Sequence, residues 1–364
     1  MTAILLLVAG IGIVNISARS APSTSEVGTP AAPGRSGSAS LAEVRRAVVN
    51  INTFAQSIDS PPGSGNLRPL GAGTGMILTS DGEILTNNHV IRQAASIRVS
   101  IPGRSQTYTA SVVGAAPSAD VALIKIDNVS GLPTVTMADP STVNIGDRVT
   151  ALGNALGRGG SPTVTKGVIT GMDRSITARD PISSPERLSG LIQTDAKIVP
   201  GDSGGPLVDT SGHVVGMITA GSATQGGGSA TVGFAIPTST AIQLVNKMRA
   251  GEASSTILLG ERGYLGVAVP PADSTQAIGI RQRLGSGRDT GAPVVGIQPQ
   301  GPADQAGMTA PALITSIDGR SIGSADALGP AIHAHKPGDK IQVTWVDQSG
   351  THTATVTLIP GPAV

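Results

Sequence analysis

The sequence contains no cysteine among its 364 residues. Disulfide bridges, thiol chemistry and metal sites with cysteine ligands are therefore excluded. Aromatic residues are scarce, with one Trp, two Tyr and two Phe, which argues against a stacking surface for single-stranded nucleic acid. The formal net charge is only +1, so no electrostatic reason exists to expect nucleic acid or an acidic membrane as a partner.

What the chain does contain is a large aliphatic fraction. Hydrophobic residues make up 39% of the sequence and charged residues 13%. A sizeable core is therefore expected, built from Val, Ile, Leu and Ala instead of aromatic rings. The length is sufficient for two or three domains.

One continuous apolar run lies near the start, at residues 3–14. It is shorter than the roughly 20 residues of a spanning helix and resembles the apolar part of a signal peptide. Small residues suited to cleavage follow, although no Lys or Arg precedes the run. Residues 1–18 are interpreted as a signal peptide or a retained membrane anchor, and both indicate an exported protein that is secreted or associated with the cell envelope. Residues 19–40, rich in Ser, Pro and Gly, are expected to form a disordered tether.

Residues 41–250 have the pattern of a mainly β domain. Short apolar runs alternate with Gly, Asp and Asn, which is typical of sandwiches or barrels. One helix is predicted over Thr238–Arg249, with Thr238 or Ser239 as its N-cap. Strands are predicted at residues 48–53, 75–79, 83–86, 108–113, 121–126, 148–152, 163–170, 214–219 and 231–236.

A smaller module follows an expected linker at residues 251–262. Residues 263–360 combine strand-like runs with one plausible helix at residues 325–333. This pattern predicts an α+β domain of roughly 100 residues, which is large enough to fold by itself.

The most informative motif is Gly201-Asp202-Ser203-Gly204-Gly205-Pro206. Glycines on both sides of Ser203 allow a tight turn, in which backbone N–H groups converge near the serine hydroxyl. The expected oxyanion donors are therefore the N–H groups of the segment Gly201, Asp202 and Ser203, with Gly201 and Ser203 as the principal pair.

A serine needs a base and a residue that orients the base. His89 follows a predicted strand, and Asp120 precedes another. The order His, Asp, Ser matches the chymotrypsin arrangement. In that arrangement His89 takes the Ser203 proton, and Asp120 fixes the imidazole tautomer.

Each of these residues alone has a simpler explanation, because aspartates before strands often form turns and single histidines are often structural. Their order and β-rich context together favour catalysis. An α/β-hydrolase esterase is rejected, since Ser203 follows both partners and alternating helices are lacking. The other histidines lack metal-site neighbours, so neither a metal nor another cofactor is expected.

Several motifs resemble the HtrA (DegP-like) family of serine proteases, and secreted mycobacterial members most closely. The motifs are Thr-Asn-Asn-His-Val at 86–90, Asp-Val-Ala-Leu at 120–123, Gln-Thr-Asp-Ala at 193–196, Pro-Gly-Asp-Ser-Gly-Gly-Pro-Leu at 200–207 and Gly-Phe-Ala-Ile-Pro at 233–237.

The resemblance implies a chymotrypsin-like double β-barrel followed by an α+β PDZ domain, together with export and protein quality control. In such a PDZ domain, the loop formed by Tyr264, Leu265, Gly266 and Val267 would receive the carboxylate of a peptide C-terminus. Homo-oligomers are compatible with this family. Trimerisation through N-terminal aromatic residues is not expected, because Phe54 is the only aromatic residue before Tyr108.

The same resemblance places the substrate pocket. Its floor would be Lys197, with Ile198 beside it, and its walls would be Thr219, Ala220 and Gly221 on one side and Val232 and Gly233 on the other. With no acid at the floor, we expect small or medium apolar substrate side chains and a Lys197 ammonium directed to solvent. An inward Lys197 would instead favour acidic substrates.

Two features depart from the family pattern. Asp202 stands where many members have Asn, and it is expected either to find another partner or to stay solvated. The residues Ala310-Pro311-Ala312 replace the usual Gly-Asp turn. The preferred interpretation is an endopeptidase that cleaves unfolded or damaged proteins. The alternative is a chaperone or peptide-binding scaffold whose protease domain is inactive at rest.

Overall fold

The computed structural model describes residues 40–157, 159–178, 186–223, 231–284 and 290–363. The expected signal peptide or anchor and nearly all of the expected tether lie outside these residues. Within them, no helix is long and apolar enough to cross a membrane. The chain divides into two compact units: unit 1 comprises the residues up to Thr53, Gly71–Ile91 and Ile97–Leu259, and unit 2 comprises Phe54–Leu70, Arg92–Ser96 and Gly260–Val364.

Unit 1 begins with a short helix, α1 (Leu41–Arg46), which has a complete capping box. Ser40 Oγ accepts from the Glu43 N–H, and the Glu43 carboxylate accepts from the Ser40 N–H. This exchange satisfies donors that an uncapped first turn would leave free.

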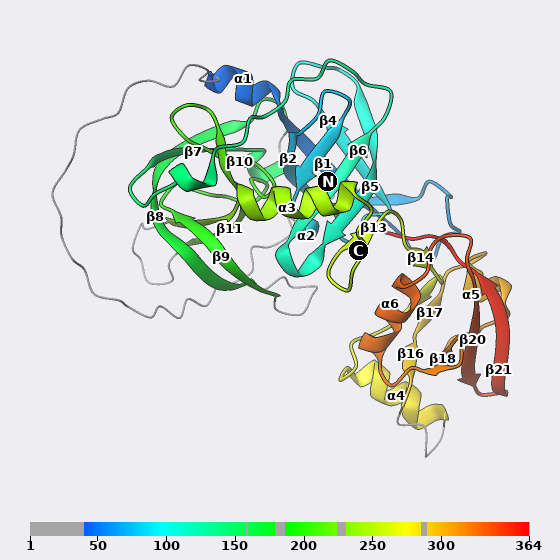
Figure 1. Cartoon of the computed structure of the whole chain (residues 1–364). Helices are drawn as coiled ribbons and strands as arrows, with labels where there is room; N and C mark the ends of the chain where they lie inside the picture. The colour runs from blue at the N-terminus through cyan, green and yellow to red at the C-terminus, as the bar shows by residue number, and fades with distance from the viewer. Residues whose placement is uncertain (1–39, 158, 179–185, 224–230, 285–289, 364) are drawn as a thin grey trace, which may run out of the picture. The chain divides into compact units, whose positions relative to one another are not determined.

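The first half of unit 1 is a ring of strands (Figure 1). The sheet order is β13-β5-β4-β1-β2-β3-β6, and a further pairing of β5 with β6 closes six of these strands into a ring. The strands are β1 (Val48–Gln56), β2 (Leu67–Ile77), β3 (Glu83–Thr86), β4 (Ser96–Ser100), β5 (Thr107–Ala116), β6 (Val121–Ile126) and β13 (Leu258–Leu259).

The second half is a closed six-stranded barrel in the order β10-β11-β12-β9-β8-β7 (Figure 1). Its strands are β7 (Arg148–Gly153), β8 (Thr163–Ala178), β9 (Glu186–Thr194), β10 (Pro206–Val208), β11 (Val214–Ala223) and β12 (Thr231–Pro237). The predicted mainly β fold with two barrels is confirmed.

One hydrophobic core joins the two barrels. It contains Met76 and Leu123 from the first barrel and Leu152 and Phe234 from the second, all with at most 2% of their surface exposed. The helix α3 (Thr238–Arg249) contacts β5 and β6 of the first barrel and β11 of the second. The remaining helical segments are α2 (Asn88–Ile91) and three 3-10 turns, η1 (Pro117–Ala119), η2 (Pro140–Thr142) and η3 (Ala155–Gly157).

Two local expectations differ from the structure. The predicted bounds of α3 agree with the structure, but Pro237 is its N-cap and no side chain caps it. The Thr238 hydroxyl instead donates to Val214 O at 2.8 Å. The expected linker at 251–262 also contains β13, which pairs with β5, and the buried Ile257. The end of the expected linker, residues 257–259, is therefore part of the folded unit 1.

Unit 2 contains the smaller α+β module. Its main sheet has the order β16-β18-β20-β21, with β19 paired to β18, and two short pairs, β14–β22 and β15–β17, complete it. The elements are β14 (Gly263–Tyr264), β15 (Val267–Ala268), α4 (Thr275–Leu284), β16 (Ala292–Val294), β17 (Gly296–Ile297), α5 (Pro302–Gln305), β18 (Ala312–Ile317), β19 (Arg320–Ser321), α6 (Ala325–His333), β20 (Lys340–Asp347), β21 (Gly350–Thr357) and β22 (Ile359–Pro360).

The core of this module is aliphatic, apart from the buried Trp345. Leu328 and Ile332 of α6 pack in the same cluster as Ile314 of β18. The helix predicted at 325–333 is confirmed, whereas α4 was not predicted.

Candidate active site

Asp120 is held in an unusual backbone conformation between η1 and β6. Its φ is 54° and its ψ 41°, in the left-handed region, where Asp is among the better tolerated residues. The Asp120 N–H donates to Pro117 O at 3.0 Å, and Asn87 Nδ2 donates to Asp120 O at 3.0 Å. The residue is 1% exposed, so its carboxylate lies in a fixed and nearly dry position.

His89 lies on α2 and faces this carboxylate. Its Nδ1 lies 2.8 Å from Asp120 Oδ2 and 3.0 Å from Oδ1, and its backbone N–H donates to Oδ1 at 2.9 Å. The carboxylate oxygens accept hydrogen bonds here, so Nδ1 carries the proton and Nε2 is the ring nitrogen that can accept one. This is the tautomer that a general base requires.

Thr219 of β11 connects Asp120 with Ser203. Its hydroxyl donates to Asp120 Oδ2 at 2.5 Å, and its carbonyl accepts from Ser203 Oγ at 3.3 Å. The family resemblance predicts Thr219 only as a pocket wall. The structure therefore brings His89 and Asp120 of the first barrel and Ser203 of the second into one region.

The loop that carries Ser203 depends on two glycines with positive φ, Gly201 at 94° and Gly204 at 86°. A Cβ on Gly204 would lie 2.0 Å from Thr74 O and 2.4 Å from Thr86 Oγ1, which no side chain can tolerate. The loop is therefore pressed against β2 and β3 of the first barrel.

Two backbone N–H groups of this loop are unoccupied. Within the described ranges, neither the Gly201 nor the Ser203 N–H donates to any acceptor. The Asp202 N–H does donate, to Val199 O at 3.1 Å. Asp202 is thus not a third oxyanion donor, because its N–H already has an acceptor within the loop.

Known protein families match both parts of the chain. Residues 73–217 match the family described as a trypsin-like peptidase domain, and residues 263–358 match the PDZ domain. The chain is 33% identical over 303 residues to a protein of Brucella suis biovar 1 named probable periplasmic serine endoprotease DegP-like. That alignment covers 83% of this chain and 55% of the relative. The chain belongs to the HtrA-type, or DegP-like, family of serine proteases.

A second relative is the serine protease PepD of Mycobacterium tuberculosis, with 32% identity over 301 residues, 79% of this chain and 60% of PepD. Among solved structures, the HtrA-type protease AlgW with tripeptide is 31% identical, with a TM-score of 0.47, and the match covers 88% of this chain and 97% of AlgW. The chain spans about half the length of the DegP-like relative.

Asp202 of this HtrA-type chain is neither solvated nor paired with a cation. It is 3% exposed, Oδ2 accepts from the Val199 N–H at 3.0 Å, and Oδ1 has no partner among the described residues. Burial raises the pKa of the carboxyl from 3.8 to about 6. A Cβ on Gly153 would lie 2.4 Å from Oδ1, so β7 closes the space beside this carboxyl.

The residues expected to line the substrate pocket lie together. Gly221 and Gly233 are paired across β11 and β12. Ile198 lies against both: a Cβ on Gly233 would be 2.6 Å from Ile198 Cγ1, and one on Gly221 would be 3.0 Å from Ile198 Cβ. Lys197 is exposed. Ala220 and Val232 are half-buried at the same strand pair.

The expected carboxylate loop of the PDZ domain joins β14 to β15. Tyr264 ends β14, Val267 begins β15, and Gly266 has a φ of 79°. The carbonyls of Leu265 and Gly266 accept from Ala303 and Gln298, respectively. Their N–H groups have no acceptor within the described part of the chain, which leaves two adjacent donors for an anion.

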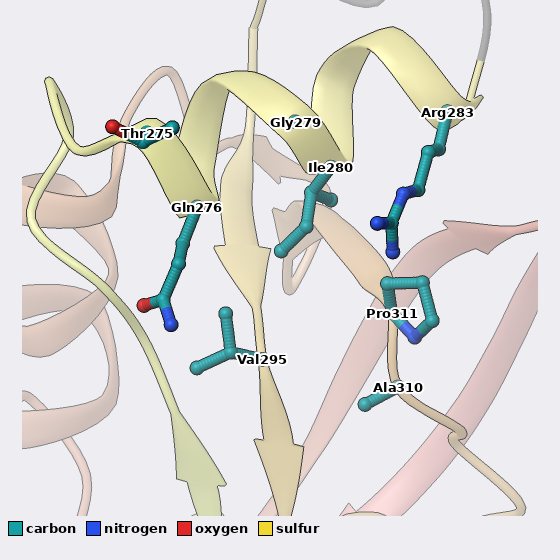
Figure 2. Close-up of a pocket in the computed structure, with 8 residues that line it drawn as sticks. All are labelled: Thr275, Gln276, Gly279, Ile280, Arg283, Val295, Ala310 and Pro311. Carbon is teal, nitrogen blue, oxygen red and sulfur yellow. The ribbon is translucent and has the colours of Figure 1, made fainter.

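A cavity of about 460 Å³ lies elsewhere in unit 2, between one face of α4 and Val295, Ala310 and Pro311. Figure 2 shows Gln276, Ile280 and Arg283 of α4 extending toward that same space. Its lining and the expected carboxylate loop have no residue in common. Across the described residues, no cluster of three or more His, Asp or Glu side chains could hold a metal ion.

Proposed function

We propose that this chain is an exported serine endopeptidase that cleaves unfolded or damaged proteins. The observation that carries the proposal is the chain of contacts from His89 to Asp120, from Asp120 to Thr219 and from Thr219 to Ser203. The trypsin-like and PDZ matches support it, as do the serine endoprotease names of the relatives.

In the proposed reaction, the Ser203 hydroxyl turns its proton from the Thr219 carbonyl, to which it donates in this structure, toward His89 Nε2. Ser203 Oγ then attacks a peptide carbonyl carbon while His89 Nε2 takes that proton. The carbonyl oxygen becomes negatively charged and accepts from the Gly201 and Ser203 N–H groups. When the C–N bond breaks, His89 gives the proton to the leaving amine, and an acyl ester remains on Ser203. Water then attacks the ester carbon while His89 takes its proton, and His89 returns that proton to Ser203 Oγ as the ester C–O bond breaks and the carboxylic acid leaves. Asp120 keeps His89 in its Nδ1–H tautomer and stabilises the imidazolium.

The substrate side chain before the cleaved bond is proposed to be small and apolar. Ile198 occupies the space between the two glycine walls, which shortens the pocket, and the exposed Lys197 supports an ammonium directed to solvent. Acidic substrates would need an inward Lys197.

The PDZ domain is proposed to bind peptide C-termini through the loop from Tyr264 to Val267. The support is the pair of unoccupied N–H groups at Leu265 and Gly266. Export to the cell envelope or beyond is supported by the periplasmic names of relatives and by the apolar run at 3–14. The proposed export is compatible with the apolar run being kept as a membrane anchor. It is also compatible with assembly of the chain into homo-oligomers.

The decisive experiment is labelling by a fluorophosphonate probe, with the Ser203→Ala variant as control. We expect the wild-type chain to be labelled and to cleave denatured casein, and the variant to do neither. A peptide with a free C-terminus, added in parallel, tests whether the PDZ domain alters the rate. A folded wild-type chain that is never labelled would contradict the proposed peptidase activity. Abundant cleavage after Arg or Lys would contradict the proposed apolar substrate pocket.

A further inference from the structure

Thr74 is a buried residue of β2 with a hydrogen bond on every polar atom. It is 0% exposed. Its hydroxyl donates to Gly201 O at 2.7 Å and accepts from the Asn154 N–H at 2.7 Å. Its N–H donates to Ser203 O at 2.8 Å, and its carbonyl accepts from Thr86 Oγ1 at 2.7 Å. A single residue of the first barrel thus contacts the Ser203 loop twice.

The direction of the hydroxyl proton follows from these partners. The Asn154 N–H can only donate, and the Gly201 carbonyl can only accept. The Thr74 hydroxyl therefore has one arrangement, with its lone pair toward Asn154 and its proton toward Gly201. Asn154 is itself fixed, since its Oδ1 accepts from the Gly159 N–H at 2.7 Å.

The two contacts hold the peptide planes on either side of the nucleophile. In the Gly201–Asp202 plane, Thr74 binds the carbonyl and Val199 O accepts from the Asp202 N–H. In the Ser203–Gly204 plane, the Thr74 N–H binds the carbonyl, while the Gly204 N–H donates to Ile218 O at 2.8 Å. A peptide plane is rigid, so a plane whose carbonyl and N–H are both hydrogen-bonded cannot rotate unless these hydrogen bonds break.

The unoccupied donors lie directly beside these planes. The Gly201 N–H precedes the first plane, and the Ser203 N–H lies between the two. Gly201 has a flexible backbone, so its N–H would turn easily if the following plane were released. Each donor is thus joined by a single residue's φ and ψ to a plane that Thr74 contacts, which limits how far the donor can turn.

We propose that Thr74 is a positioning residue that keeps the oxyanion hole formed, an inference that rests on the proposed peptidase function. Thr74 does not touch the substrate; it acts through the carbonyls of Gly201 and Ser203. The Thr74 hydroxyl binds the Gly201–Asp202 plane, and the Thr74 backbone N–H binds the Ser203–Gly204 plane. A substitution of the side chain therefore removes the first contact and leaves the second in place.

The test compares Thr74→Val, which keeps the shape and removes the hydroxyl, with Thr74→Ser, which keeps the hydroxyl. Thr238→Val is the matched control, because Thr238 is also buried and its hydroxyl also donates to a backbone carbonyl. For peptide amide hydrolysis we expect Thr74→Val to lower kcat about 10–100-fold with KM nearly unchanged. Thr74→Ser should retain kcat within about threefold of wild type, and Thr238→Val should leave it unchanged.

Amide hydrogen exchange measures the same effect without catalysis. In Thr74→Val the Asp202 N–H should exchange faster, whereas the Gly204 N–H should keep its protection, because its plane is still held by the Thr74 N–H. Unchanged exchange at Asp202 would overturn the proposal, as would equal loss of kcat in Thr238→Val. If the folded wild-type chain hydrolyses nothing, the peptidase function fails, and the exchange at Asp202 still decides whether Thr74 holds the loop.

Discussion

The Thr219 hydroxyl donates to Asp120 Oδ2 at 2.5 Å, and the Thr219 carbonyl accepts from Ser203 Oγ at 3.3 Å. One residue of the second barrel thus orients both the carboxylate beside His89 and the nucleophile. Because Thr219 is 5% exposed, water does not easily replace its hydroxyl.

We predict that Thr219→Val lowers kcat about tenfold, because the Asp120 carboxylate loses a charge-assisted hydrogen bond worth about 1.5–3 kcal/mol in typical proteins. Thr219→Ser should restore most of the rate, since it keeps the hydroxyl. Steady-state kinetics on a peptide amide measure both variants. Equal rates for Thr219→Val and wild type would show that the contact has no part in orienting Asp120.

We predict that Asp202→Asn stabilises the protein at neutral pH. Burial raises the pKa of Asp202 from 3.8 to about 6, so the folded state binds more protons than the unfolded state between these values. Stability from this group is therefore fully present below about pH 4 and is lost as pH rises through about 6. At pH 8 the variant avoids a penalty on the order of 1–3 kcal/mol.

Thermal unfolding at pH 4 and pH 8 checks this prediction. The Tm of Asp202→Asn should exceed that of wild type by a few degrees at pH 8, and the difference should shrink at pH 4. Asp127→Asn, which removes the same charge from an exposed position, is the control. A Tm advantage that is larger at pH 4 than at pH 8 would contradict the assigned sign.

We predict that Ile198→Ala deepens the substrate pocket. The wild-type pocket should favour Ala or Val before the cleaved bond, because Ile198 lies against Gly221 and Gly233. The variant should raise kcat/KM for Leu relative to Val about 10–100-fold, the range expected for one or two methylene groups in an apolar pocket. Competition between matched peptides measures the ratio. Lys197→Ala is the control and should leave the preference unchanged, whereas a changed preference would indicate an inward Lys197.

We predict that Gly266→Ala weakens peptide binding at least about tenfold, because an alanine at a φ of 79° costs roughly 1–2 kcal/mol and shifts the neighbouring N–H groups. Gly307→Ala is a matched control, with a φ of 81° and open space around its Cβ. Titration with a labelled peptide compares them. Equal affinity of the wild type for the free-acid and amidated peptides would argue against a carboxylate loop.

The strand pattern predicts a mainly β domain, and the resemblance of short motifs to a known family predicts the two-barrel fold and the close approach of His89 to Asp120. Strand-like runs are contiguous, and the histidine, aspartate and serine motifs each cover a few residues. The three-residue β10 is not predicted, although it begins at Pro206 within the serine motif.

Contacts that depend on how strands align across the barrels could not be predicted in this way. Thr219 and Asp120 are 99 residues apart, and Thr74 and Gly201 are 127 apart. Neither threonine stands in a distinctive motif. The burial of Asp202 could not be predicted for the same reason, because it depends on the close approach of Gly153 in β7. The helix α4 was missed because Gly279 interrupts a sparse apolar pattern.

The strand β13 has a consequence for how unit 1 unfolds. Along the described residues, the chain forms the first barrel and then the second, continues into α3, which contacts both, and returns to the first barrel. There Leu258 pairs with Ala115 of β5. The second barrel is therefore tied to the first at both of its ends, and the effective concentration of one barrel near the other stays high even when their shared core loosens. Separation would also require loss of the β13–β5 pairing and of the buried Ile257. We therefore expect the two barrels to unfold as one cooperative unit, with their separation coupled to the β13–β5 pairing at the edge of the first sheet.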